Sequence, residues 1–333
     1  MTRPPRPLPG PARIAVDLLG GEDAPAVVVD GALRASSVDP ELRLLLVGPR
    51  EVADEVVSAL PPAARDRVDL LLAAHAVGAT DEPVRAVRPG TTVLAGASAV
   101  SRGAADGLVS AGPSGATVTA AVLALGRGVR RPPLAAMLPG RAGPVVLLDV
   151  GGSVDPAPPV LLANALLGSA YARVVLGVDA PRIGLLSIGA EPGKGDRWRR
   201  AAYGRLGLHP LPEGARFVGN VEGYDVSLGD RADVVVTDGF TGNVLLKGIE
   251  GAYALAGGEM PPETAPRAAA LLGVGGTVVV CHSAAGGQDL ASAIMLAAFL
   301  HRVGAAAQLK TAVGHVRAVS AQIGAVLRSE VMS

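Results

Sequence analysis

Short apolar runs alternate with stretches of helical periodicity along nearly the whole chain. The clearest example is 233–251, where three valines precede a glycine-bracketed turn and a helical stretch. Because strands alternating with helices build parallel sheets covered on their faces, this pattern predicts an α/β fold with a largely parallel sheet. No internal repeat and no clean interdomain linker interrupt it, so we expect one two-lobed α/β domain over 13–333.

The expected strands are apolar and short, at 14–17, 43–47, 68–73, 107–110, 134–138, 145–150, 183–188, 217–219, 234–236 and 277–280. The expected helices have helical apolar spacing, at 26–35, 51–60, 91–101, 116–125, 159–171, 197–206, 289–303 and 309–327, with one more after the turn 238–242. The strands at 134–138 and 145–150 are separated only by a Pro/Gly turn, which predicts an antiparallel hairpin.

The composition describes a globular protein with balanced charge. Hydrophobic residues make up 49% of the 333 residues and the mean hydropathy is +0.40, which excludes a disordered chain. Acidic and basic residues number 30 each, and aromatic residues are only 2%. Without a basic excess or aromatic stacking platforms, we expect no nucleic-acid partner.

The single cysteine and the N-terminus bear on compartment. Cys281 alone cannot form an internal disulfide, and its position at the end of a strand predicts a small buried thiol. Residues 1–12 are proline-rich without an apolar core, so we expect a disordered arm and no signal peptide. No apolar run reaches the roughly 18 residues of a membrane span. The expected location is the cytoplasm.

Five glycine-rich turns follow the carboxyl ends of expected strands, the edge where open α/β sheets bind ligands. They are 20–25, 111–116, 151–155, 189–195 and 238–243. None carries a dinucleotide or P-loop fingerprint, and the GxSxG and HExxH hydrolase motifs are absent as well. These five turns together predict an anion site of another kind.

The turn after the strand 234–236 carries a carboxylate, Asp238, and an amide, Asn243, at a helix start. Helix-start N–H groups and the helix dipole favour anions, so this turn predicts an anion site with polar chemistry beside it. The alternative is structural: Asp238 caps the helix, and Lys247 and Glu250 form a surface pair at i,i+3 spacing. Among five scattered histidines, only His282, at a strand end, is kept as a candidate acid or base.

Six motifs occur in the order of a known family. They read IAVDLLGGEDAP at 14–25, VSAGPSGA at 109–116, LLDVGGSVD at 147–155, RIGLLSIGAEPGKG at 182–195, FVGNVEG at 217–223 and DVVVTDGFTGNVLLKGIEG at 233–251. The chain thereby resembles the phosphate:acyl-acyl carrier protein acyltransferases, the PlsX family. The resemblance implies a three-layer α/β/α fold similar to isocitrate and isopropylmalate dehydrogenases. It also implies conversion of acyl-acyl carrier protein and inorganic phosphate to acyl phosphate for phospholipid synthesis, without metal or organic cofactor.

The resemblance also implies site residues and partners. Asp238, Lys247, Glu222 and His282 are the candidate catalytic residues. Phosphate, oxyanion and thioester binding is expected from Asp17, Gly20, Gly21, Ser110, Gly112, Gly115, Lys194, Asn220, Gly239, Phe240, Gly242 and Asn243. Backbone N–H groups of Gly112, Gly115, Gly239 and Gly242 are the expected cradle. The implied partners are acyl carrier protein, a second copy in a homodimer and a membrane glycerol-3-phosphate acyltransferase.

Departures from the family pattern fall at polar positions. Pro113 replaces an asparagine, Ser187 stands where the family has another asparagine, and Glu22 replaces an aspartate. Gly152 and Ser153 replace the alanine and the asparagine of a Gly-Ala-Asn motif. The stretch 280–285 keeps only the histidine of a Lys-x-His-Gly-Ser-Ser motif. The stretch 252–276 is shorter than in the family and has no amphipathic basic helix, so we expect only weak membrane association.

These departures leave other functions open. One alternative is a catalytically weakened paralogue that still binds a carrier protein or partner acyltransferase. Another is an acyltransferase with altered substrates in a specialised pathway. A dinucleotide-dependent dehydrogenase is disfavoured, since it would rest on fold similarity alone.

Overall fold

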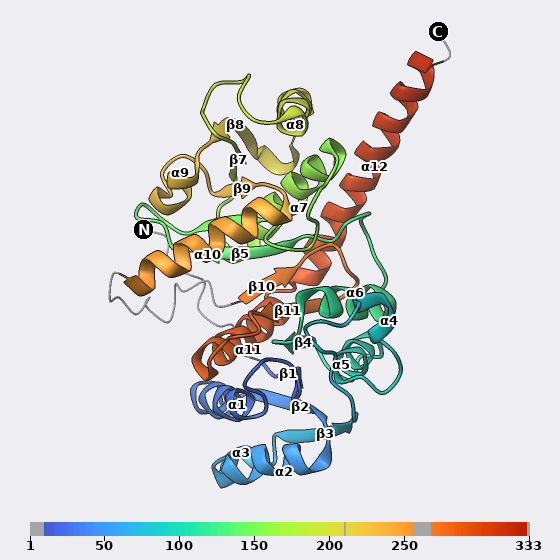
Figure 1. Cartoon of the computed structure of the whole chain (residues 1–333), viewed down its shortest axis with the longest axis vertical. Helices are drawn as coiled ribbons and strands as arrows, with labels where there is room; N and C mark the ends of the chain where they lie inside the picture. Colours follow the sequence, from blue (N-terminus) through green and yellow to red (C-terminus); the bar gives the residue numbers. More distant parts are fainter. Residues whose placement is uncertain (1–9, 210, 256–267, 332–333) are drawn as a thin grey trace. The chain divides into compact units, whose positions relative to one another are not determined.

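The computed structural model of the chain describes residues 10–209, 211–255 and 268–331 (Figure 1). The chain divides into two compact units, each with its own strands, helices and core. Unit 1 contains Gly128–Ala256 and Ala307–Ser333, and unit 2 contains Arg6–Arg127 and Gly257–Ala306. Most of the expected proline-rich arm, residues 1–9, lies outside the described residues, as do residues 256–267 of the shortened stretch.

The strands of unit 2 lie in the order β3-β2-β1-β4-β11-β10. They are β1 (Ala12–Asp17), β2 (Leu42–Gly48), β3 (Val68–Leu72), β4 (Gly107–Ser110), β10 (Ala268–Leu271) and β11 (Thr277–Cys281). All pairs are parallel except β10 with β11. Because β1, β4 and β11 are parallel neighbours, the loops after their carboxyl ends meet at one edge of the sheet.

Helices cover both faces of the unit 2 strands, as Figure 1 shows for α1 and α11 on one side and α5 and α6 on the other. The helices are α1 (Ala26–Val38), α2 (Arg50–Ala59), α3 (Pro62–Arg65), α4 (Pro83–Ala86), α5 (Thr92–Ser101), α6 (Ser114–Leu125) and α11 (Gly287–Arg302). Gly31 of α1 lies directly against Leu290 of α11, where a Cβ would come within 2.8 Å of the leucine side chain. Small residues thus allow the two helices to pack closely.

The strands of unit 1 lie in the order β5-β6-β9-β7-β8. They are β5 (Leu134–Leu138), β6 (Val145–Leu148), β7 (Arg182–Leu186), β8 (Arg216–Val221) and β9 (Val234–Val236). The β5–β6 hairpin is antiparallel, which confirms the prediction, and the other pairs are parallel. The loops after β6, β7, β8 and β9 therefore share one edge, and this edge carries the candidate site of unit 1.

Unit 1 has helices α7 (Pro158–Leu176), α8 (Arg197–Leu208), α9 (Gly223–Leu228) and α10 (Gly239–Leu255), a 3-10 turn at Pro212–Gly214, and most of α12 (Ala305–Val331). Helix α7 has 19 residues and is long and apolar enough to cross a membrane by length and composition, which corrects the expectation that no apolar stretch reaches that length. It packs against β6, β7 and β9 and is mostly buried there, so its apolar composition is explained by the protein core.

The α/β fold with a mostly parallel sheet is confirmed, with differences at particular elements. Strand β10 was not predicted, because Ala268–Leu271 is alanine-rich and has low strand propensity. The turn predicted at 238–242 is helical from Gly239 onward, and α6 begins at Ser114 instead of 116. Helix α9, within the motif 217–223 and the residues after it, was also missed.

Candidate functional site

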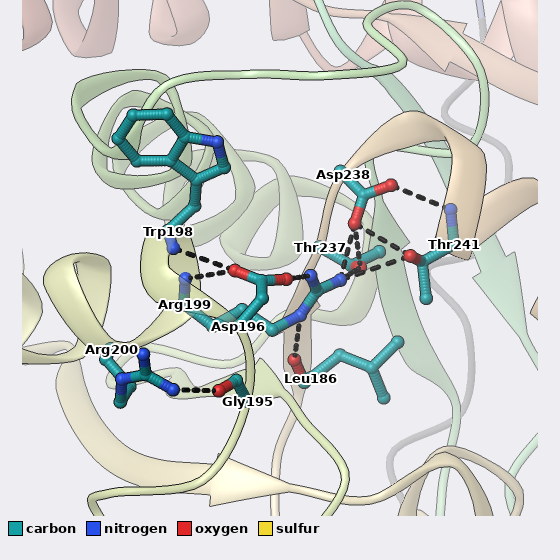
Figure 2. Close-up of polar contacts among 9 residues, drawn as sticks. All are labelled: Leu186, Gly195, Asp196, Trp198, Arg199, Arg200, Thr237, Asp238 and Thr241. Atoms are coloured by element: carbon teal, nitrogen blue, oxygen red, sulfur yellow. Dashed lines mark hydrogen bonds and ion pairs between the residues drawn. The ribbon is translucent and has the colours of Figure 1, made fainter.

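The centre of the unit 1 edge is Arg199, a residue of α8 that sequence reasoning did not single out (Figure 2). Its guanidinium pairs with Asp238 after β9 and with Asp196 at the start of α8. Its Nε donates to the Leu186 carbonyl at the end of β7, 2.9 Å away, and Nη2 donates to the Thr241 hydroxyl, 3.1 Å away. Arg199 is 15% exposed, so this largely buried cation ties together two strand ends and the first turn of α10.

Asp238 caps α10, as the structural alternative proposed. Its Oδ1 accepts from the Thr241 N–H and its Oδ2 from the Thr241 hydroxyl, both at 2.8 Å. Partial burial alone would raise the pKa of Asp238, but the hydrogen bonds from Thr241 and the pairing with Arg199 outweigh it and lower the pKa. A carboxylate held in this way is a weak base, so its contacts favour positioning over proton transfer.

Most N–H groups of the first turn of α10 are already used, which corrects part of the predicted cradle. The Gly239 N–H donates to the Ser153 carbonyl at 2.8 Å, and the Gly242 N–H donates to the Asp238 carbonyl at 2.9 Å. The Thr241 N–H goes to the cap. Among the described residues, the Phe240 N–H is the donor of this turn for which no acceptor is found. An anion at this helix start would bind there.

The loop after β6 is held by a buried carboxylate, Asp149, that sequence reasoning also missed. Its Oδ1 accepts N–H groups of Leu134 at 3.0 Å, Gly151 at 3.1 Å and Gly152 at 2.8 Å. Its Oδ2 is buried and, within the described chain, has no hydrogen-bond partner. Burial raises the pKa of Asp149 to about 6, against the lowering effect of the backbone hydrogen bonds.

Helix α10 rests directly on this loop. A Cβ on Gly242 would lie 2.0 Å from the Asp149 carbonyl oxygen, and a Cβ on Gly239 would lie 2.8 Å from the Ser153 oxygen. The Asn243 amide donates to the Val150 carbonyl at 3.0 Å. The two glycines are therefore required by close backbone contact, and Asn243 fastens α10 to the loop.

The predicted Asn220 lies near the carboxyl end of β8, and Glu222 follows that strand at the same edge. The Asn220 side chain is 1% exposed and its Nδ2 donates to the Glu191 carbonyl at 2.7 Å, so it holds the loop before α8. Glu222 is the N-cap residue of α9, and its backbone N–H donates to the Asp225 carboxylate at 2.8 Å. Both residues support neighbouring loops.

The two predicted lysines lie at different places in unit 1. Lys194 is exposed in the loop between β7 and α8, two residues before the Asp196 cap. Lys247 is exposed on α10, eight residues beyond Gly239, which corresponds to roughly 12 Å along a helix axis. Phe240 and Val244, 63% and 57% exposed, lie on the same α10 face as Lys247 by helical spacing.

In unit 2, the loops after β1 and β4 are joined through Asp17 and Ser110. The Ser110 hydroxyl donates to Asp17 Oδ2 at 2.8 Å and accepts from the Gly112 N–H at 3.1 Å, which corrects the prediction that this N–H holds an anion. Burial raises the pKa of Asp17, against hydrogen bonds from Thr92, Ser110 and two backbone groups. A Cβ on Gly20 would lie 2.8 Å from the Gly112 nitrogen, so glycine permits the close contact of these loops.

The loop after β11 joins the same group in unit 2. The Ser283 hydroxyl donates to the Glu22 carboxylate at 2.7 Å, and the Glu22 N–H donates to the Ser283 carbonyl at 2.8 Å. His282 is exposed, and its Nδ1 accepts from the Ala284 N–H at 3.1 Å. Gly21, with φ 118°, lies beside the Ser283 carbonyl. The structure thus places Gly21 and His282 at one loop cluster.

Two further predictions concern Gly115 and Cys281. A Cβ on Gly115 would lie 2.9 Å from the Pro83 ring, so this glycine packs against α4. Cys281 is buried as expected, and burial raises its thiol pKa. Within residues 10–209, 211–255 and 268–331, no three His, Cys, Asp or Glu side chains are grouped so that they can hold a metal ion.

Comparison with known proteins identifies the family. The model of the family described as "Fatty acid synthesis protein" matches residues 12–260. A phosphate acyltransferase of Thermobifida fusca is 39% identical over 322 residues, covering 88% of each chain. The phosphate acyltransferase of Bacillus subtilis is 42% identical over 246 residues, covering 72% of this chain and 71% of that protein.

The chain belongs to the fatty acid synthesis protein family, whose named relatives here are phosphate acyltransferases. It is an enzyme of the acyltransferase class, and the PlsX-type resemblance is confirmed. Two solved structures share the fold. EutD phosphotransacetylase from Staphylococcus aureus has a TM-score of 0.60 and 18% identity, over 87% of this chain and 94% of that protein. A branched-chain phosphotransacylase from Enterococcus faecalis has a TM-score of 0.59 and 15% identity, over 88% of this chain and 99% of that protein.

The structure shows the contacts of three residues at which this chain departs from the family pattern. Glu22 and Ser283 pair with each other. Pro113 is the N-cap residue of α6, and its carbonyl accepts the Ala116 N–H at 2.9 Å. The Ser187 hydroxyl is buried, and no hydrogen-bond partner for it occurs in the described part of the chain. It lies 2.9 Å from where a Cβ on Gly195 would be, beside the Lys194 loop.

Proposed function

We propose that this phosphate acyltransferase family member converts acyl-acyl carrier protein and inorganic phosphate to acyl phosphate and free carrier protein. The observation that supports it is the arrangement of the unit 1 edge. Arg199 fixes the first turn of α10 beside the loop that carries Lys194, and the Phe240 N–H remains as a helix-start donor. A lysine next to a free helix-start donor suits a doubly charged phosphate.

The reaction needs placement and charge stabilisation, and no covalent enzyme intermediate. A phosphate oxygen attacks the thioester carbonyl carbon, the C–S bond breaks, and the proton of the attacking hydrogen phosphate ends on the released thiol. Lys194 and the Phe240 N–H bind the phosphate in this proposal, and Arg199 and Asp238 position them. Because the enzyme holds two reactants in line, the rate gain comes mainly from orientation and from oxyanion stabilisation.

The exposed face of α10 supports an acyl-thioester substrate. Phe240 and Val244 present apolar surface next to the Phe240 N–H, and Lys247 follows on the same face. In the proposal these side chains contact the acyl chain or its pantetheine arm, and Lys247 adds positive charge. His282, Asp17, Gly20, Gly21, Ser110, Gly112 and Gly115 of unit 2 stay proposed substrate contacts or their supports.

Partners and location are further parts of the proposal. Acyl phosphate is a reactive mixed anhydride, so a glycerol-3-phosphate acyltransferase that consumes it directly is the proposed downstream partner. A homodimer and a cytoplasmic location with weak membrane contact complete the proposal. It predicts that little of the pure protein cosediments with anionic liposomes.

A trapping assay tests the function. The pure protein is incubated with long-chain acyl-acyl carrier protein, phosphate and hydroxylamine, and acyl hydroxamate is measured with and without phosphate. We expect hydroxamate that depends on both enzyme and phosphate. Lys194→Ala should raise the phosphate KM, because it removes a phosphate ligand, and leave the KM for the acyl donor nearly unchanged.

A catalytically weakened paralogue is the second candidate, favoured by the occupied N–H groups of Gly112, Gly239 and Gly242. No hydroxamate across acyl-chain lengths, together with intact carrier-protein binding, would support it. Turnover only with an unusual acyl group would instead support an altered substrate.

A further inference from the structure

Helix α8 carries an unusual charge pattern on its solvent side. Residues 189–205 contain five basic and two acidic residues, a net charge of +3 in a chain whose total is zero. Three of these cations, Lys194, Arg197 and Arg200, are exposed. We call Arg197 and Arg200, the two that lie on the helix itself, the α8 basic cluster.

The position of the cluster is electrostatically costly for the helix itself. Positive side chains in the first turn face the positive end of the helix dipole, which destabilises the helix start. Arg199 is explained by its ion pairs with Asp196 and Asp238. Arg197 and Arg200 are not, because no carboxylate pairs with either one in the described residues.

Local contacts hold these side chains in place without neutralising them. The Arg197 guanidinium lies 4.3 Å from the centre of the Trp198 ring. Arg200 donates to the Gly195 carbonyl at 2.6 Å, a contact drawn at the left of Figure 2, apart from the Arg199 network. Both retain their charge and are pre-oriented, which lowers the entropy lost when a partner binds.

Beyond its first turn, the exposed face of α8 is not covered at its two glycines by any other described part of the protein. A Cβ on Gly204 or Gly207 would meet no atom within 4 Å, so nothing in the described structure requires glycine there. The face therefore combines cations at its start with bare backbone beyond them. It lacks the apolar stripe with which amphipathic helices enter a bilayer.

We propose that the α8 basic cluster is the docking surface for the carrier protein that delivers the acyl thioester, and that it meets acidic side chains of that protein. This inference rests on the proposed function. The cluster begins at the strand-end edge that holds Arg199 and Lys194, so a partner bound there would present its thioester arm to that edge. Positive side chains that face acidic side chains of the carrier would steer association and fix the orientation of the complex.

The test compares charge reversals at the two edges of unit 1. The variant R197E/R200E removes the cluster, and R141E/R216E makes the same charge change at exposed arginines of the opposite edge, in the β5–β6 turn and at the start of β8. Binding of fluorescently labelled holo-acyl carrier protein is measured by anisotropy at low and physiological salt. We expect R197E/R200E to weaken binding by about tenfold or more and R141E/R216E to change it less than twofold.

Kinetics separate docking from chemistry. With acyl-acyl carrier protein, R197E/R200E should raise KM by a similar factor, while turnover of an acyl-pantetheine thioester and the phosphate KM stay at the parent values. Equal carrier binding by the parent and both variants overturns the docking site, as does absence of carrier binding by the parent. Loss of binding to phosphatidylserine vesicles alone, with carrier binding intact, assigns the cluster to a membrane surface and also overturns it.

The two proposals fail differently. If the parent makes no acyl phosphate but R197E/R200E still loses carrier binding, the proposed function is wrong and the docking surface stands. If acyl phosphate forms and R197E/R200E binds the carrier normally, the proposed function stands and the docking surface is wrong.

Discussion

Arg199 and Asp238 form an ion pair in which both side chains are about 15% exposed or less, and it connects α8 to the first turn of α10. Removing one partner leaves the other charge partly buried and unpaired. We expect Arg199→Leu or Asp238→Asn to lower the free energy of unfolding by about 3 kcal/mol, measured by urea denaturation. The double variant should lose less than the sum, with a coupling energy of about 1–3 kcal/mol.

The contribution of this ion pair to the free energy of unfolding depends on pH. The folded-state pKa of Asp238 is lowered, so its stabilising contribution is fully present above its ordinary pKa near 4 and is lost as the pH falls further. The parent should therefore lose stability below about pH 4 more steeply than Asp238→Asn. Parallel curves for the two proteins would contradict the pairing.

For Asp149, the predicted change of stability with pH has the opposite sign. Its folded-state pKa of about 6 lies above the ordinary value of 3.8, so the folded protein holds more protons than the unfolded chain between these values. Stability is then lost as the pH rises from about 4 to 6, by about 3 kcal/mol in total.

Asp149→Asn keeps an oxygen for the three N–H donors and removes the titration. Relative to the parent, the free energy of unfolding of Asp149→Asn should therefore rise by about 2–3 kcal/mol between pH 4 and 7. Denaturant unfolding of both proteins at each pH measures this difference. A difference that stays constant with pH would show that Asp149 does not titrate there.

Two glycines of α10 give a matched pair of substitutions. Gly242→Ala places a Cβ 2.0 Å from the Asp149 carbonyl oxygen and must displace backbone, so we expect a loss of at least about 2 kcal/mol. Gly248→Ala places a Cβ in open space in the same helix and should stabilise by about 1 kcal/mol. Thermal unfolding of both variants checks the opposite signs.

Ser187 predicts a small effect on stability. Its buried hydroxyl lacks a partner in the described residues, so replacing the serine with alanine, in which a hydrogen takes the place of the hydroxyl, removes an unpaired polar atom. We expect Ser187→Ala to be neutral or to stabilise by up to about 1 kcal/mol. A clear destabilisation in urea unfolding would show that the hydroxyl is hydrogen-bonded in solution.

The strand–helix order and the β5–β6 hairpin could be predicted because apolar periodicity and turn residues are local signals. The start of α10 could not, since Asp238 caps a helix that begins immediately while the glycines at 239 and 242 suggest a turn. Those glycines suggested open N–H donors, whereas tight packing on the Asp149–Ser153 loop requires them.

Arg199 and Asp149 were missed for a related reason. Asp238, one partner of Arg199, is 39 residues away in sequence, and only the folded arrangement of the start of α8 and the end of β9 brings the two together. The available signal was an arginine-rich helix start that the dipole disfavours. Asp149 was visible as a carboxylate ending an apolar strand, but its three backbone donors depend on the folded loop.

The most direct test of the proposed function follows both products of one reaction. Radiolabelled phosphate and palmitoyl-acyl carrier protein are incubated with the pure enzyme, and labelled acyl phosphate and free carrier thiol are measured together over time. The proposal predicts equal amounts of the two products, both abolished when enzyme is omitted. Thiol release without incorporation of phosphate, or no release of thiol, would contradict it.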